Sequence, residues 1–255
     1  MEQVTDKQKL IATFREDGFV LIPGFLKEDE VVEIHDHLEK LIRDKVPHMP
    51  VEHVFYEDKN DLSSLKQLQT LFTYDPFFYD MMFKSRFEEL ASILLQDEVV
   101  PRNMQYFNKP PQKGKPTPPH QDGYYFMLDP NEAVTMWLGL EEVDPENGCV
   151  RYVKGSHIKG IRPHSKTQTL GFSQGISNFG TDDDTLNEVF FATKASDLLA
   201  HHSLTIHRAD ANNSEHRSRK ALGLIYYAAS AKENTEAKKR YQEKLAEEIK
   251  AKTLI

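Results

Sequence analysis

The stretch TPPHQDGYYF, residues 117–126, places a histidine and an aspartate two positions apart, directly before a group of aromatic residues. Two residues apart on a β-strand, the side chains of His120 and Asp122 project from the same face. An imidazole nitrogen and a carboxylate oxygen on one face supply two ligands of the 2-His-1-carboxylate site of non-haem iron oxygenases. We therefore predict a strand that carries part of a metal site, with a further histidine supplied by another strand.

Short β-branched and aromatic runs, separated by Pro, Gly and Asn, continue on both sides of this stretch from about residue 98. They are VVPRNMQYFN, HQDGYYFML, AVTMWLGLEEV, CVRYV, EVFFAT, SDLLAHHSLTIH and RKALGLIYYA. Such a succession of strands and turns predicts a β-sandwich or a barrel. The fold class that we expect is therefore mainly β, with flanking helices.

The chain before residue 98 has mostly helical patterns. A capping box opens at Thr5, apolar residues recur at helical spacing from Val31 to Ile42, and SRFEELASILLQ (85–96) is helical in type. GFVLIPGFL (18–26) is a short β-rich run. We predict one domain over residues 1–255, with N-terminal helices over about 5–96, a β core over about 98–228 and a charged C-terminal helix over about 233–252.

Residues 158–187 form the longest stretch without a regular pattern, and such stretches are often lids or binding loops.

Composition excludes several classes of protein. The net charge of −8 over 255 residues argues against non-specific binding to nucleic acid. No apolar run reaches about 18 residues, so no membrane span is expected, and the N-terminus lacks a signal-peptide pattern. Cys149 is the only cysteine, which fits a reducing cytoplasm and rules out an internal disulfide.

Candidates for the third metal ligand lie in HHSLTIHRADANNSEHRSRKALGLIYY (201–227). Counting back from His207 by twos places Thr205, Ser203 and His201 on one polar face, which suits the inside of a barrel. We expect His201 and His202 to be structural, with one of them hydrogen-bonding beside the site.

Arg219 opens the last predicted strand, and the small residues Ala221 and Gly223 share its face. They leave room for a ligand beneath the guanidinium, which is suited to binding a carboxylate through two hydrogen bonds. The alternative is a surface arginine in an ion pair.

Together these segments resemble the phytanoyl-CoA dioxygenase family of Fe(II)/2-oxoglutarate-dependent oxygenases, from about Gly18 to Tyr227. The resemblance lies in four motifs, in order: GFVLIPGFL, FNKPPQKGKPTPPHQD, WLGLEEVDPENGCVRYVKGSH and HHSLTIHRADANNSEHRSRKAL. It implies a double-stranded β-helix, also called a jelly roll and similar to the cupin fold.

The resemblance also implies an iron site and a reaction. His120, Asp122 and His207 would bind Fe(II), and the enzyme would use O2 and 2-oxoglutarate to hydroxylate a small molecule, releasing succinate and CO2. Related halogenases have Ala or Gly in place of the carboxylate, so Asp122 favours hydroxylation.

For the cosubstrate, the resemblance implies that Arg219 binds the distal carboxylate of 2-oxoglutarate and that Trp137 and Gln105 contact it. Two features depart from the family pattern. Arg208 and the alanine after it replace a Gly-Ser pair, and the spacing from the distal histidine to the arginine is one residue longer. The longer spacing makes Arg217 a rival to Arg219.

Substrate contacts are expected from two places. Tyr124, Tyr125 and Phe126 follow the metal pair and either line the pocket or pack in the core. Arg162 and His164 form a basic pair that suits an anionic group on the substrate. The protein is expected to be a monomer or a homodimer.

Two alternatives remain: a non-catalytic binding or regulatory jelly-roll protein, and a cupin-like metalloenzyme that does not use 2-oxoglutarate.

Overall fold

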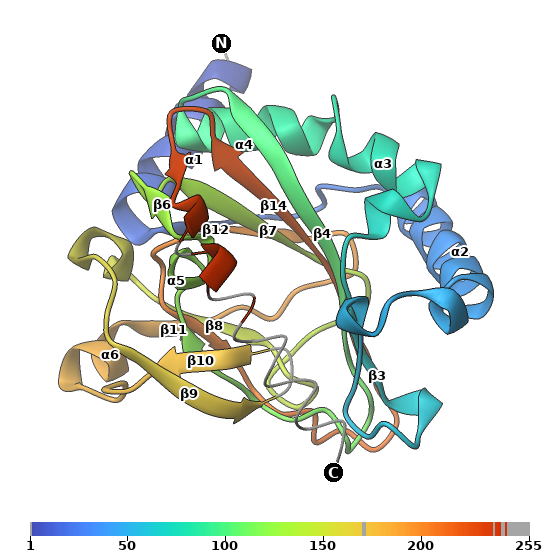
Figure 1. Cartoon of the computed structure of the whole chain (residues 1–255). Helices are drawn as coiled ribbons and strands as arrows, with labels where there is room; N and C mark the ends of the chain where they lie inside the picture. Colours follow the sequence, from blue (N-terminus) through green and yellow to red (C-terminus); the bar gives the residue numbers. More distant parts are fainter. Residues whose placement is uncertain (1, 170–171, 237, 241–242, 244–255) are drawn as a thin grey trace.

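Two antiparallel β-sheets packed face to face form the centre of the molecule (Figure 1), in a computed structural model that describes residues 2–169, 172–236, 238–240 and 243. The larger sheet contains, in spatial order, β1 (Phe19–Ile22), β12 (Leu198–His202), β7 (Ala133–Gly139), β14 (Arg219–Ala228), β4 (Val99–Lys109), β3 (Leu65–Leu68) and β2 (Val54–Tyr56). The smaller sheet contains β11 (Glu188–Phe190), β8 (Val150–Val153), β13 (His207–Ala209) and β5 (Thr117–His120). The predicted jelly roll is confirmed.

Helices cover the outer face of the larger sheet, on the side away from the smaller sheet (Figure 1). They are α1 (Glu2–Asp17), α2 (Glu28–Asp44), α3 (Pro76–Met82) and α4 (Arg86–Leu95). The predicted apolar stripe is buried on α2, where Val31, Ile34, Leu38 and Leu41 face the core. Short 3₁₀ turns lie between α2 and α3, at Val46–His48, Val51–His53, Leu62–Ser64 and Leu71–Thr73. Another, Ser156–Lys159, follows β8.

The larger sheet is buried on both faces, and alternation along its strands separates the two environments. In β7, Val134, Met136 and Leu138 pack with the helices, whereas Trp137 packs against the smaller sheet beside Tyr152. Successive side chains of a strand point to opposite faces, so one strand serves both interfaces. The residues that face the smaller sheet are the ones available to an internal site.

Two segments contain more regular structure than their sequence pattern indicates. Within residues 158–187, β9 (His164–Thr169) and β10 (Phe172–Ile176) form a hairpin beside β5, and α6 (Asp182–Asn187) follows. The region before residue 98 contributes β2 and β3 to the larger sheet in addition to helices. The remaining pair, β6 (Leu128–Asp129) and β15 (Lys232–Glu233), lies beside the short helix α5 (Gly123–Phe126).

The predicted C-terminal helix lies partly outside the described residues. Glu233, the first residue of the predicted helix, belongs to β15, and residues 235–236, 238–240 and 243 are helical. Among the described residues, every helix is too short or too polar to cross a bilayer.

Candidate active site

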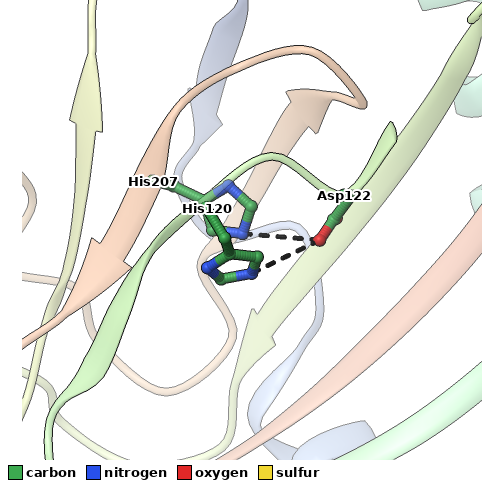
Figure 2. Close-up of side chains that lie close together, drawn as sticks. All are labelled: His120, Asp122 and His207. Carbon is green, nitrogen blue, oxygen red and sulfur yellow. Dashed lines mark ion pairs between the residues drawn. The ribbon is translucent and has the colours of Figure 1, made fainter. Parts of the chain in front are cut away.

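His120, Asp122 and His207 meet between the two sheets (Figure 2). The Nε2 atoms of His120 and His207 lie 3.5 and 3.6 Å from Oδ1 of Asp122. The two histidines are direct partners across β5 and β13 in the smaller sheet, and their rings are 4.2 Å apart. One potential ligand atom from each residue falls within 4.8 Å of the others, so the predicted cluster is present.

The local structure at Asp122 differs from the predicted strand. β5 ends at His120, and Asp122 has helical dihedral angles (φ −58°, ψ −36°) at the start of α5. The chain turns here because Gly123 packs against Asn131, where an added Cβ would lie 2.5 Å from the Asn131 side chain. The Asn131 amide also donates a hydrogen bond to the Gly123 carbonyl. The aspartate therefore reaches the site from a strand-to-helix turn.

The predicted alternation over residues 201–207 is also wrong, because these residues do not form one strand. β12 ends at His202 in the larger sheet, and β13 begins at His207 in the smaller sheet. Between them the chain crosses from one sheet to the other, with the Thr205 hydroxyl bonded to the Gly18 carbonyl at 2.7 Å. His201 nevertheless faces the site, and its Nε2 lies 3.2 Å from Oδ2 of Asp122.

Backbone carbonyls fix the orientation of both histidine ligands. Nδ1 of His120 donates to the Pro118 carbonyl at 2.8 Å, and Nδ1 of His207 donates to the Thr205 carbonyl at 3.0 Å. A proton on Nδ1 places the ring's lone pair on Nε2, the atom that is directed at the cluster, as metal ligation requires.

Electrostatics favour the protonation states that bind a metal. Burial, together with neighbouring His120 and His201, holds the pKa of His207 well below its ordinary value. Burial alone would raise the pKa of Asp122, but nearby His207 and hydrogen bonds from His120 and His201 outweigh it and hold that pKa well below the usual range. His207 thus presents a neutral imidazole and Asp122 a carboxylate anion, and together with the His120 nitrogen this donor set fits an iron site.

Arg219 lies fully buried in the same interior, with its guanidinium 5.6 Å from the Trp137 ring. Its Nε has no hydrogen-bond partner among the described residues. Burial lowers the pKa of Arg219 to about 10, so the group is still charged at neutral pH. A buried cation without a matching anion is costly, and a carboxylate ligand would satisfy it.

A row of residues across the larger sheet lies between Arg219 and the metal cluster. Gln105, Gly223 and Trp137 are neighbours in β4, β14 and β7. A Cβ on Gly223 would lie 2.8 Å from the Phe107 ring, so this position requires glycine. The Gln105 side chain accepts a hydrogen bond from Gln67 at 3.2 Å. Trp137 and Gln105 thus lie in one row across the sheet, and their contact with a cosubstrate stays a prediction.

Two buried lysines beside Arg219 were not predicted from the sequence. Lys109 is the β4 partner of Arg219, and Lys66 in β3 pairs with Glu57 at 3.2 Å. Burial lowers the pKa of both lysines, and the charge of Arg219 lowers both further. Glu57 pairs with Lys66, whereas the Nε of Arg219 has no hydrogen-bond partner among the described residues, so this end of the interior suits an anionic ligand.

Arg217 lies in a different environment from Arg219. It is partly exposed and forms ion pairs with Asp144 at 2.8 Å and with Glu146 at 2.5 Å. Of the two rival arginines, only Arg219 is buried and faces the interior.

The three aromatic residues after Asp122 differ in their surroundings. The Tyr124 ring stacks on His164, with centroids 4.2 Å apart and planes 20° apart. The Tyr125 hydroxyl donates to the Gln174 carbonyl at 2.7 Å, which fixes α5 to the β9–β10 hairpin. Phe126 is buried in a small apolar cluster. Tyr124 and His164 therefore form a half-buried aromatic wall, whereas Phe126 belongs to the core.

Arg162 is occupied by contacts within its own segment. Its guanidinium bonds to the buried Asp184 at 2.5 Å and to the Asn178 side chain at 3.0 and 3.1 Å. Both nitrogens of His164 also have partners, the Arg162 carbonyl and the Gln121 amide. These contacts favour a structural role for Arg162 over binding of an anionic substrate.

Arg162→Ala is expected to destabilise the fold by about 1–3 kcal/mol, because the buried Asp184 loses its charged partner. The matched control is Lys159→Ala, which breaks an exposed pair with Asp183 and is expected to change stability by at most about 0.5 kcal/mol. Urea unfolding of the three proteins measures the difference. Equal stability of the two variants would contradict the structural role.

Comparison with known proteins agrees with the family resemblance of the sequence over most of the chain. The family profile described as Phytanoyl-CoA dioxygenase (PhyH) matches residues 14–221. Phytanoyl-CoA dioxygenase domain-containing protein 1 of Mus musculus is 25% identical over 245 residues, which cover 80% of this chain and 84% of that protein. Phytanoyl-CoA dioxygenase of Arabidopsis thaliana is 26% identical over 245 residues, which cover 83% of this chain and 85% of that protein.

Among solved structures, the epimerase SnoN in complex with Fe3+, alpha ketoglutarate and nogalamycin RO superposes with a TM-score of 0.71. It is 22% identical, with 90% of this chain and 86% of that chain covered, and this likeness shows a shared fold. The family profile spans both histidine ligands and Arg219, and it ends within β14. The chain belongs to the phytanoyl-CoA dioxygenase family.

Proposed function

We propose that this protein is an Fe(II)- and 2-oxoglutarate-dependent dioxygenase that hydroxylates a small molecule and releases succinate and CO2. One observation carries the proposal: a buried His-Asp-His cluster shares its interior with buried Arg219, whose Nε has no hydrogen-bond partner among the residues that the structure describes. Neither a binding module nor a cupin-like enzyme without the cosubstrate requires both features.

The protein groups bind and orient the reactants. His120, Asp122 and His207 would hold Fe(II), and the Nδ1 hydrogen bonds of the two histidines keep their Nε2 atoms directed at it. Bound Fe(II) supplies, with O2 and 2-oxoglutarate, the oxidising chemistry. Because Asp122 provides a carboxylate ligand, hydroxylation is favoured over halogenation.

The cationic end of the interior would orient 2-oxoglutarate. Arg219 would bind its distal carboxylate through two hydrogen bonds, with the charge of Lys66 nearby. Trp137 would pack against the carbon chain of 2-oxoglutarate and exclude water. The exclusion of water would strengthen the attraction of Arg219 and Lys66 for the carboxylate.

The substrate itself is proposed only as a small molecule that reaches the metal past Tyr124 and His164. Because Arg162 is held by Asp184, the support for an anionic substrate is weaker than the sequence indicated. We propose a cytoplasmic monomer or homodimer, consistent with the buried free thiol of Cys149.

Anaerobic titration with Fe(II) and 2-oxoglutarate is expected to produce the weak visible charge-transfer band of a chelated Fe(II)–2-oxoglutarate complex. The band reports both ligands at once, because it requires 2-oxoglutarate bound to the metal. Subsequent addition of O2 should give succinate, measured across a panel of substrates. A wild-type protein that binds Fe(II) but gives no band would favour the cupin-like alternative.

A further inference from the structure

The second carboxylate oxygen of Asp122 is occupied by two donors from the larger sheet. The Thr135 hydroxyl donates to Oδ2 at 2.6 Å, and Nε2 of His201 lies 3.2 Å from the same atom. Oδ1 is the oxygen that faces the other two ligands. The strand register explains the convergence, because His201 and Thr135 are direct partners in β12 and β7.

Asp122 determines which nitrogen of His201 carries the proton, and a buried tyrosine contacts the other nitrogen. The Tyr152 hydroxyl lies 3.2 Å from Nδ1 of His201 and is fully buried. Oδ2 of Asp122 can only accept, so the His201 proton belongs on Nε2, and Nδ1 accepts from the Tyr152 hydroxyl. Tyr152, His201 and Asp122 thus form a directed chain of hydrogen bonds inside the protein.

Occupation of Oδ2 has a consequence for metal binding. An aspartate that bound the metal through both oxygens would fill a position that 2-oxoglutarate or O2 requires. With Oδ2 engaged by two donors, only Oδ1 remains for the metal. We propose that His201 is a positioning residue that, together with Thr135, restricts Asp122 to one metal bond and keeps the remaining positions open. The inference rests on the function proposed above.

The neighbouring histidine provides a matched control. His202 belongs to the same strand but points to the opposite face, where its Nε2 lies 3.2 Å from Glu132. Its Nδ1 accepts a hydrogen bond from the Leu204 amide. Both histidines are buried, so replacing either one disturbs packing, but of the two only His201 contacts Asp122.

The test measures Co(II) affinity and the visible Co(II) spectrum in His201→Phe, His201→Gln and His202→Gln. His201→Phe should weaken Co(II) binding by about 10- to 100-fold, the usual effect of losing a hydrogen bond to a metal ligand. His201→Gln keeps an N–H near the position of Nε2 and should recover most of the affinity and the wild-type spectrum. His202→Gln should match the wild type.

Several outcomes would overturn the inference. Unchanged Co(II) affinity and spectrum in His201→Phe would do so, as would an equal loss in His202→Gln. A His201→Gln protein as weak as His201→Phe would identify the ring as a direct ligand instead. If His201→Phe does not fold, Tyr152→Phe leaves His201 in place and should weaken Co(II) binding by about threefold, a small part of the energy of one hydrogen bond. No change there would also overturn the inference.

Co(II) binding and the Fe(II)–2-oxoglutarate band, measured on the wild type, together separate this inference from the proposed function. A wild-type protein that binds Co(II) but gives no Fe(II)–2-oxoglutarate band would contradict the function and leave the His201 comparison intact. A wild-type protein that binds no Co(II) would overturn both.

Discussion

His207→Ala is expected to abolish Fe(II) binding and to reduce succinate formation by more than about 100-fold. Loss of a hydrogen bond to a metal ligand costs about 10- to 100-fold, and removal of the ligand itself costs more. The substitution leaves His120 and Asp122 in place, but two of the three ligands do not complete the site. Anaerobic Fe(II) titration and a succinate assay measure the two effects.

His120→Ala should give the same result, because the two rings are partners across β5 and β13 and have equivalent hydrogen bonds. His202→Ala is the control, since this buried histidine pairs with Glu132 on the other face of β12. Stoichiometric Fe(II) binding in either ligand variant would show that the metal binds elsewhere.

Arg219→Leu is expected to raise KM for 2-oxoglutarate by about 10- to 100-fold. A hydrogen bond to a charged group contributes about 1.5–3 kcal/mol, and each 1.4 kcal/mol corresponds to about a factor of ten in affinity. The KM of Arg219→Lys for 2-oxoglutarate should lie between those of Arg219→Leu and the wild type, because an ammonium group keeps the charge but cannot form two parallel hydrogen bonds with a carboxylate. Steady-state kinetics with varied 2-oxoglutarate measure the effect.

Arg217→Leu is the matched control, because Arg217 lies outside the interior in ion pairs with Asp144 and Glu146. It should leave KM for 2-oxoglutarate within about twofold of the wild type, since an exposed pair contributes little. The reverse pattern, with KM raised by Arg217→Leu alone, would assign the cosubstrate to the other arginine. Arg219→Leu should not destabilise the protein without cosubstrate, because it removes a buried charge whose Nε has no hydrogen-bond partner among the described residues.

The sequence predicted the metal cluster by a partly wrong route. His120 and Asp122 do lie together, but through a turn at Gly123 and not through strand alternation. An H-x-D pair is consistent with either geometry, because both bring the side chains to one side. What distinguishes them is the contact between Gly123 and Asn131, eight residues further along, and no local pattern shows that contact.

His201 shows a similar limit. Alternation over residues 201–207 assumed a continuous strand, and the chain instead crosses between sheets at residues 203–206. Its role beside Asp122 depends on the register of β12 against β7, which brings it opposite Thr135. Register across distant strands is set by the whole hydrophobic pattern of a sheet and is not visible in one segment.

Lys66 was missed for a different reason. It lies in a four-residue strand, and no strand is expected from the sequence between residue 26 and residue 98. Its burial results from the position of β3 next to β4, so its nearness to Arg219 is a property of the assembled sheet.

The hydrogen bonds of Asp122 also join the two halves of the molecule. The carboxylate follows a strand of the smaller sheet and accepts hydrogen bonds from two strands of the larger one. A metal held by His120, His207 and Asp122 would thus fasten the sheets together, and a ligand that binds only the native state adds its binding free energy to folding. Loss of the metal would then lower the free energy of unfolding of the protein as well as stop turnover.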